Sequence, residues 1–194
     1  MKNILILIII PNLYCKFIIM RHGSSETNAK HIYNSNPQNP NYVISNLTEH
    51  GRKHIAKDAQ LLRKLGINDN NISHVYVSPM PRAQQTAEIL YKNGLFKQEK
   101  IKIEPKLTER QAGYLENTPS QPKLDLRPYG GENSEDVYKR NLEFLQNLDI
   151  DAKKNIIIIT HKSDIKQLTK IISGKEKILN TGEFVILPFN IILN

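Results

Sequence analysis

Apolar residues fall into two patterns along the chain: short runs, and longer segments in which they recur at helical spacing. The runs predict strands at residues 16–20, 74–77, 101–104, 156–159 and 183–187. The helical spacing predicts helices at residues 48–65, 79–93, 132–148 and 163–172. Predicted strands and helices therefore alternate along the chain from residue 16 to residue 187.

This alternation is typical of α/β proteins, and it predicts a three-layer α/β/α sandwich around a mainly parallel sheet. Ligands of such sheets bind beyond the carboxyl ends of the strands. Four polar residues come directly after predicted strands, namely Arg21, His22, Ser78 and His161. The segment 24–46 is rich in Asn, Ser and Pro, which predicts a long loop beside this edge.

Length and composition fit one folded domain, with 194 residues, 39% of them hydrophobic and 24% charged. The formal charge of +8 comes largely from scattered Lys residues, and no basic run is interleaved with aromatic residues. We therefore expect no nucleic-acid binding, whereas a small anionic substrate stays possible. The single cysteine, Cys15, excludes an internal disulfide and a cysteine-based metal cluster.

Residues 1–15 form a possible signal peptide or N-terminal extension. Lys2 precedes the apolar run 4–10, which has the length of the hydrophobic region of a secretory signal. Tyr14 and Cys15 make a poor cleavage site, so a buried strand and a misassigned start are alternatives. A cleaved signal would place the protein outside the cytoplasm or in the periplasm, and otherwise it would be cytoplasmic. No segment approaches the length of a membrane span.

His22, flanked by Arg21 and Gly23, is by itself a weak indication of catalysis. His161 at the end of another predicted strand and Arg82 at the start of a helix strengthen it, because three groups that bind anions then share one edge of the sheet. Arginine donates two hydrogen bonds to phosphate oxygens and keeps its charge. The residues alone therefore predict a phosphate pocket.

Six segments together resemble the motifs of one family. They are Phe17–Gly23 with Ser25 and Asn28, Leu47–Gly51, Ser78–Ala87, Leu107–Arg110, Gly130–Glu132 and Thr160–His161. In this order they resemble the histidine phosphatase superfamily, in the branch of the cofactor-dependent phosphoglycerate mutases and fructose-2,6-bisphosphatase. The resemblance covers about residues 16–190. It implies a phosphoglycerate mutase-like fold and a histidine phosphatase domain at residues 16–194.

The resemblance also implies roles for individual residues. His22 would be the nucleophile that forms a phosphohistidine, and Glu109 the proton donor. The phosphate would be bound by Arg21, Asn28, Arg82 and His161. His161 also counts as catalytic, since a protonated ring would donate to an equatorial oxygen, so the pKa values of the two histidines should be tuned in opposite directions. Neither a cofactor nor a metal is implied.

Two positions after His161 complicate the comparison. Lys162 stands where this branch usually has glycine, which changes the close backbone approach expected there and adds a cation. Asp164 is a competing candidate for the proton donor. Its alternative interpretation, a carboxylate in the first turn of a helix that complements the helix dipole, is the favoured one.

The segment 110–129 is short for the cap with which mutases shield a phosphohistidine from water. This favours a phosphoric monoester hydrolase that acts on a small phosphorylated metabolite. The alternatives are a cofactor-dependent phosphoglycerate mutase, a protein phosphohistidine phosphatase and an inactive binding scaffold. The sequence does not indicate the natural substrate or the oligomeric state.

Overall fold

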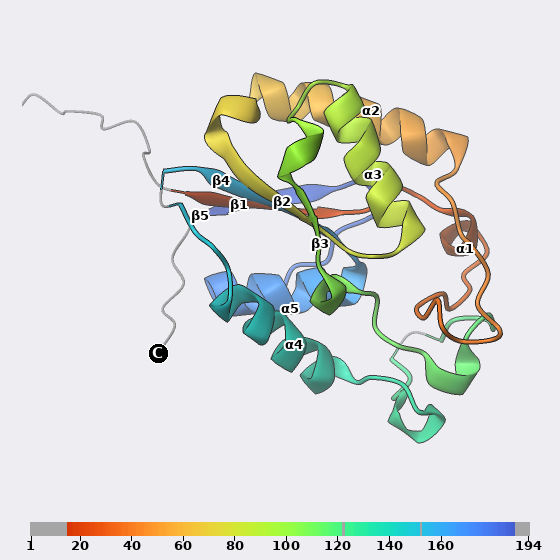
Figure 1. Ribbon diagram of the computed structural model, residues 1–194. Helices are drawn as coiled ribbons and strands as arrows, with labels where there is room; N and C mark the ends of the chain where they lie inside the picture. The colour runs from red at the N-terminus through yellow and green to blue at the C-terminus, as the bar shows by residue number, and fades with distance from the viewer. Residues whose placement is uncertain (1–14, 122, 152, 189–194) are drawn as a thin grey trace, which may run out of the picture.

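A five-stranded sheet forms the centre of the protein, as shown by a computed structural model that describes residues 15–121, 123–151 and 153–188 (Figure 1). Its strands are β1 (Lys16–Arg21), β2 (Ile72–Val77), β3 (Ile101–Ile103), β4 (Asn155–Thr160) and β5 (Phe184–Pro188). They lie in the order β3-β2-β4-β1-β5. The first four are parallel, and β5 runs antiparallel to β1 at the edge. The predicted mainly parallel sheet is confirmed.

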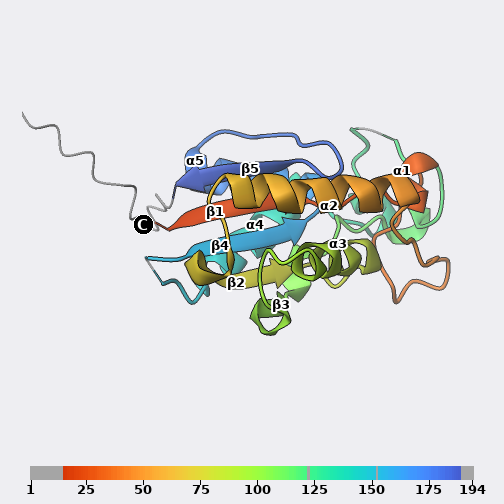
Figure 2. The same ribbon diagram turned by 90° about the horizontal axis from the view of Figure 1, so that it is seen from above.

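Helices cover both faces of this sheet. They are α1 (Glu26–Ala29), α2 (Glu49–Lys64), α3 (Pro81–Lys92), α4 (Ser134–Gln146) and α5 (Lys162–Ser173). Short 3-10 helices lie at Asp69–Asn71, Gln98–Lys100, Pro105–Leu107, Gly113–Leu115 and Arg127–Tyr129. In Figures 1 and 2, α2 and α3 lie on one side of the sheet, and α4 and α5 lie on the other. The predicted three layers are therefore present.

The central strands are apolar throughout because both of their faces are buried. In β1, Ile18 and Met20 belong to the core under α2 and α3. Phe17 and Ile19 belong to the core under α4 and α5. All of these side chains are fully buried. A continuous apolar run is the expected pattern of a parallel strand between two helical layers.

Helix ends follow the signals in the sequence. Thr48 caps α2 by accepting a hydrogen bond from the backbone N–H of Gly51 (3.0 Å). Beyond its other end, Gly66 has a φ of +82°, a left-handed conformation that glycine adopts without strain. The predicted loop 24–46 contains one short helix, α1, so that prediction was wrong for Glu26–Ala29. Four residues are too few to produce a helical period.

The predicted signal or extension at residues 1–15 lies outside the described residues, apart from Cys15. The Cys15 side chain is buried in the core under α4 and α5. Among the helices of the described ranges, none combines the length and apolar character needed to cross a bilayer.

Candidate active site

The ends of three neighbouring strands bring the predicted site residues together. His22 follows β1, Ser78 follows β2 and His161 follows β4. Arg82 lies in the first turn of α3. Because β2, β4 and β1 are adjacent and parallel, the side chains meet at one edge of the sheet, and the rings of His22 and His161 are 4.9 Å apart.

His22 is fully buried, and two hydrogen bonds fix its ring. Its Nδ1–H donates to the carbonyl oxygen of Gly23 (2.7 Å), which places the proton on Nδ1. Its Nε2 accepts from the Nε–H of Arg82 (3.1 Å). Burial, reinforced by the charges of Arg82 and Arg21, holds the pKa of this imidazole well below 6.5. His22 is therefore neutral, with its lone pair on Nε2.

His161 is also fully buried and lies between a cation and a hydroxyl group. Its Nδ1 accepts from Nη2 of Arg82 (3.3 Å), and its Nε2 lies 2.7 Å from the hydroxyl oxygen of Ser78. Burial and the charge of Arg82 hold the pKa of His161 well below 6.5 as well. In the ligand-free protein the two pKa values are thus shifted in the same direction rather than in opposite directions, because both rings are fully buried and the same arginine lies against both.

Arg82 is almost completely buried, and the loop after α1 holds its guanidinium group. Nη1 donates to Oδ1 of Asn34 (2.7 Å), and Nη2 donates to the carbonyl oxygen of the same residue (2.8 Å). The Asn34 side chain in turn donates to the carbonyl oxygen of Val43 (2.7 Å). The loop thus fixes the position of the arginine beside His22.

Arg21 and Asn28 complete the predicted set. Arg21 is the last residue of β1 rather than the first beyond it, because it pairs with Thr160 in the sheet. Its Nη1 donates to the carbonyl oxygen of Leu179 (3.0 Å), while its buried Nε lacks a partner among the described residues. In Asn28, Oδ1 accepts from the hydroxyl of Ser25 (2.9 Å), which leaves the amide NH₂ available to a ligand.

Glu109, in the loop after the Pro105–Leu107 turn, also lies beside His161 and Arg82. One carboxylate oxygen lies 3.5 Å from Nδ1 of His161 and 3.9 Å from Nη2 of Arg82. The side chain is 21% exposed, so solvent reaches it. Next to it, the backbone N–H of Gln111 donates to Glu132 (3.0 Å). The predicted Gly130–Glu132 motif therefore steadies the loop that carries Glu109.

Asp164, the competing proton donor, lies away from the pocket. It is fully buried, and its Oδ1 is 2.5 Å from Nη1 of Arg140. Burial raises the pKa of its carboxyl group well above the ordinary value, although Arg140 acts in the opposite direction. The Arg140 side chain also binds Glu132 (2.9 Å). Asp164 thus belongs to a buried network behind the Glu109 loop.

A pocket of about 200 Å³ is lined by Arg82 and Glu109, the two residues that contact the buried histidines, whereas His22 and His161 themselves are not part of its lining. Its lining includes the predicted residues Arg21, Asn28, Arg82 and Glu109, together with Arg110 and Lys162. This volume is below the range of about 300–1,000 Å³ that is typical of drug-sized ligands. The pocket is therefore suited to a small anionic molecule.

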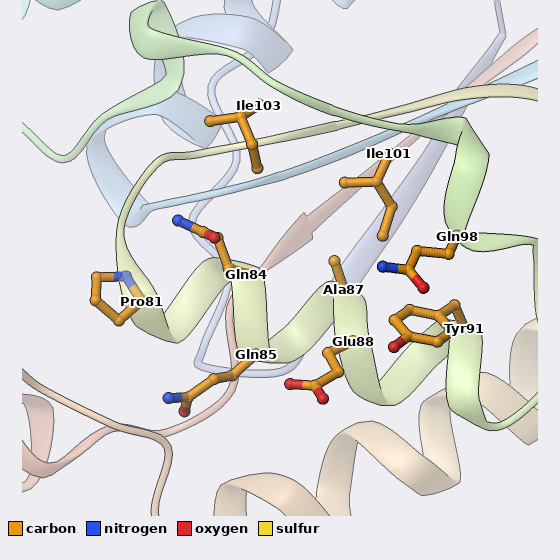
Figure 3. A pocket seen from close by; sticks show the side chains of 9 residues that line it. All are labelled: Pro81, Gln84, Gln85, Ala87, Glu88, Tyr91, Gln98, Ile101 and Ile103. Carbon is orange, nitrogen blue, oxygen red and sulfur yellow. The ribbon is translucent and has the colours of Figure 1, made fainter.

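A larger hollow of about 470 Å³ lies elsewhere, between α3 and the edge strand β3 (Figure 3). Its lining residues are Pro81, Gln84, Gln85, Ala87, Glu88, Tyr91, Gln98, Ile101 and Ile103. Glu88 is the charged residue among them, and neither an arginine nor a histidine contributes. The smaller pocket is therefore the better candidate for phosphate chemistry, despite its size.

A nitrogen from each of His22 and His161 and an oxygen of Glu109 lie within 4.8 Å of one another, close enough to bind one metal ion. Arg82, however, donates a hydrogen bond to each of the two rings. A divalent cation would face this permanent charge at short range. An anionic phosphoryl group would instead be attracted by the arginine.

Three supporting residues were not predicted from the sequence, namely Asn34, Ser35 and Glu116. Asn34 holds Arg82, and its neighbour Ser35 is bound by Glu116, whose two carboxylate oxygens accept from the Ser35 N–H (2.8 Å) and hydroxyl (2.6 Å). Glu116 is 1% exposed. All three residues lie outside helices and strands, so no periodicity marked them.

Comparison with known proteins decides the family. The sequence model of the histidine phosphatase superfamily (branch 1) matches residues 17–179. The chain belongs to this superfamily. The matched segment includes each of the predicted site residues, from Arg21 to His161.

Relatives of this chain carry different names. Phosphoglycerate mutase-like protein 4 of Arabidopsis thaliana is 27% identical over 203 residues, which cover 91% of this chain and 81% of the relative. A phosphoglycerate mutase of Candida albicans is 28% identical over 66% of this chain, but only 47% of the relative is covered. Superfamily members are phosphatases or mutases.

Solved structures show the same fold. An Escherichia coli K-12 protein proposed to be an alpha-ribazole-5′-P phosphatase has a TM-score of 0.69 and 19% identity, covering 89% of each chain. YhfR of Bacillus stearothermophilus has a TM-score of 0.69 and 21% identity, covering 89% of this chain and 90% of that one. At this level of identity the comparison establishes the fold.

Proposed function

We propose that the protein hydrolyses small phosphomonoesters through a phosphohistidine on His22, with Glu109 as proton donor. The observation that carries the proposal is the state of the His22 ring. Its proton is held on Nδ1 by the Gly23 carbonyl, its pKa is lowered by burial and by Arg82, and its Nε2 accepts a hydrogen bond from Arg82, which lines the pocket. A neutral imidazole with a fixed lone pair is what nucleophilic attack on phosphorus requires.

In the first step, the Nε2 lone pair attacks phosphorus and the ester P–O bond breaks. Arg21, Arg82, Asn28 and His161 bind the three equatorial oxygens, and the positive charges offset the charge of the transferring group. Glu109 gives its proton to the leaving oxygen, so that an alcohol departs. A bound dianion would also favour the protonated form of His161, which could then donate from both ring nitrogens.

In the second step, the Glu109 carboxylate takes a proton from water, and the resulting nucleophile attacks the phosphorus of phosphohistidine. The N–P bond breaks, the electron pair returns to Nε2, and inorganic phosphate leaves. One carboxylate serves both steps because leaving group and water occupy the same side of the phosphoryl group in turn. The position of Glu109, 21% exposed at the pocket wall, supports this use.

Access of water favours hydrolysis over transfer to a second substrate. Between Glu109 and Gly130 the described chain forms one 3-10 turn at Gly113–Leu115 and another at Arg127–Tyr129. Gln121 and Lys162, which line the pocket, are exposed. Water therefore has access to the pocket, and hydrolysis is the default fate of a phosphohistidine that water can reach.

The test is hydrolysis of an aryl phosphate by wild type and by His22→Ala. We expect the variant to lose at least about 10³-fold in kcat, because no other group can take over the nucleophile's role. Its unfolding curve should show a folded protein. His50→Ala, which changes an exposed histidine on α2, is the matched control and should keep wild-type activity. Activity in folded His22→Ala would overturn the proposal.

A mutase is the second candidate, because the Arabidopsis and Candida relatives carry that name. Incubation with 3-phosphoglycerate and 2,3-bisphosphoglycerate, followed by ³¹P NMR, separates the two reactions. A hydrolase releases inorganic phosphate. Formation of 2-phosphoglycerate faster than inorganic phosphate would establish the mutase instead.

A further inference from the structure

Arg140, in the middle of α4, lies behind the loop that carries Glu109 and has no part in the reaction steps proposed above. Its side chain is 14% exposed, and its guanidinium group donates four hydrogen bonds. Nε and Nη2 donate to the two carboxylate oxygens of Glu132 (2.9 and 3.2 Å). Nη1 donates to Oδ1 of Asp164 and to the carbonyl oxygen of Lys106 (both 2.5 Å). A planar, permanently charged group with these contacts fixes several segments relative to one another.

Two of these contacts hold the Glu109 loop, one on each side of Glu109. Before it, the carbonyl oxygen of Lys106 accepts directly from Arg140. After it, the backbone N–H of Gln111 donates to Oε2 of Glu132 (3.0 Å), the same oxygen that accepts from Nη2 of Arg140. The Glu132 N–H in turn donates to the Gln111 carbonyl oxygen (2.9 Å). The backbone is therefore fixed on both sides of the proposed proton donor.

The direction of the Glu109 carboxylate depends on that backbone. One oxygen, Oε1, accepts from the backbone N–H of the next residue, Arg110 (3.0 Å). The other, Oε2, lies 3.5 Å from Nδ1 of His161 and 3.9 Å from Nη2 of Arg82. Both of these distances exceed that of a normal hydrogen bond, so the two contacts hold the carboxylate only weakly. A shift of the loop would therefore move the carboxylate with it.

The contact with Asp164 ties the loop to the helix that follows His161. Asp164 is fully buried in the first turn of α5, and His161 is the residue directly before this helix. The helix α4, which carries Arg140, packs against α5 (Figure 1). Arg140 therefore fixes the position of Glu109 relative to His161, and not the position of the loop alone.

We propose that Arg140 is a positioning residue of the reaction, which keeps the Glu109 carboxylate within reach of the leaving oxygen. The inference rests on the proposed function, since it takes Glu109 as the proton donor. Arg140 does not line the pocket, so its effect reaches the substrate through Glu109. The position of a proton donor matters only when the leaving group needs a proton. This requirement separates positioning from a general contribution to stability.

Two aryl phosphates test the proposal through kcat/KM, which covers the steps up to cleavage of the P–O bond. Phenolate leaves poorly without a proton, whereas 2,4-dinitrophenolate is a stable anion that needs none. Glu109→Gln is the reference and should lose about 10²–10⁴-fold on phenyl phosphate but far less on 2,4-dinitrophenyl phosphate. We expect Arg140→Gln to show the same selective loss, about 10²-fold on phenyl phosphate, the effect of misplacing a group by about 1 Å.

Lys139→Ala, which removes an exposed cation of the same helix, is the matched control and should keep both kcat/KM values. Unfolding curves establish that each variant is folded. Should Arg140→Gln not fold, Glu132→Ala decides, because it releases the loop on one side and should give the same selective loss. An equal loss on the two esters, or no loss, in the folded variant would overturn the inference.

Failure of the proposed function would have a different signature. A wild type that hydrolyses neither ester, or a Glu109→Gln variant without a selective loss, would overturn the proposed reaction and this inference with it. A selective loss in Glu109→Gln that is absent from Arg140→Gln and Glu132→Ala would overturn the inference alone.

Discussion

The protonation states of the two imidazoles follow from the groups around them. The Gly23 carbonyl selects the tautomer of His22, and Arg82 approaches both His22 and His161 as a hydrogen-bond donor. Burial adds the largest contribution, because a charged ring would lose its hydration. The proposed nucleophile is thereby kept unprotonated beside the basic side chains of the pocket.

This arrangement predicts a pH dependence of stability. As the pH falls through 6.5, the unfolded chain takes up a proton at His22, whereas the folded chain does not until its lowered pKa is reached. The free energy of unfolding therefore decreases below pH 6.5. His22→Gln removes this contribution, so between pH 6 and pH 5 it should lose about 1 kcal/mol less stability than the wild type. Urea unfolding at the two pH values measures the difference, and equal losses would contradict the lowered pKa.

The residues of the proposed reaction were easier to predict than the residues that support them. His22, Arg82 and His161 could be found because they follow strands or begin a helix, and such positions converge in an α/β sheet. Asn34 and Glu116 act through hydrogen bonds between two irregular segments. No local pattern encodes which loops meet, so the sequence alone could not reveal them.

The close approach of helix α2 to the loop after β1 helps to position the site. The amino end of α2 lies against the backbone that follows His22, and Gly51 makes this possible. A Cβ at Gly51 would meet the Ser24 carbonyl oxygen and would lie 2.9 Å from the Ser24 N. The predicted Leu47–Gly51 motif thus has a structural role, since it sets the distance between α2 and the loop that follows His22.

Gly51→Ala tests this contact. In an ordinary helix the change would stabilise the protein, because alanine is the better helix former by about 1 kcal/mol. Here the clash with backbone should reverse the sign and cost about 1–3 kcal/mol, with a drop in kcat as the His22 loop moves. Thermal unfolding and aryl phosphate turnover measure both effects. Lys53→Ala, at an exposed position of α2, is the control, and a stabilised, fully active Gly51→Ala would refute the role.

Most elements could be predicted because their apolar residues are buried in a regular pattern. The fully buried run in β4 and the helical spacing in α2 are clear examples. Boundaries moved by at most two residues, as in α4, which was expected at 132–148 and spans Ser134–Gln146. The helix α1 was missed, since it is held by the Ser25 and Asn28 capping contacts rather than by an apolar face.

At the scale of the whole molecule, the site joins parts that lie far apart in the sequence. It draws on the ends of β1, β2 and β4, the start of α3, and the loops around residues 34 and 109. A ligand that bridges these parts binds only the folded chain. Its binding energy therefore adds to the stability of the entire domain rather than to one segment.

Inorganic phosphate, the expected product, should thus raise the Tm. At a concentration of about 100 times its Kd, phosphate would add about 2.7 kcal/mol to the free energy of unfolding. For a domain of this size that corresponds to a rise of roughly 5–10 °C. Differential scanning fluorimetry in phosphate and in sodium chloride of equal ionic strength measures the specific part. Equal shifts in the two salts would show that the pocket does not select phosphate.

The antiparallel edge strand has a practical consequence. Because β5 runs against β1, Pro188 pairs with Lys16, so the two ends of the described chain lie side by side. They lie at the amino end of β1, about 20 Å of extended chain away from His22. An affinity tag or a surface tether attached near either residue would therefore hold the protein at the edge of the sheet opposite the site, with the mouth of the pocket facing the solution.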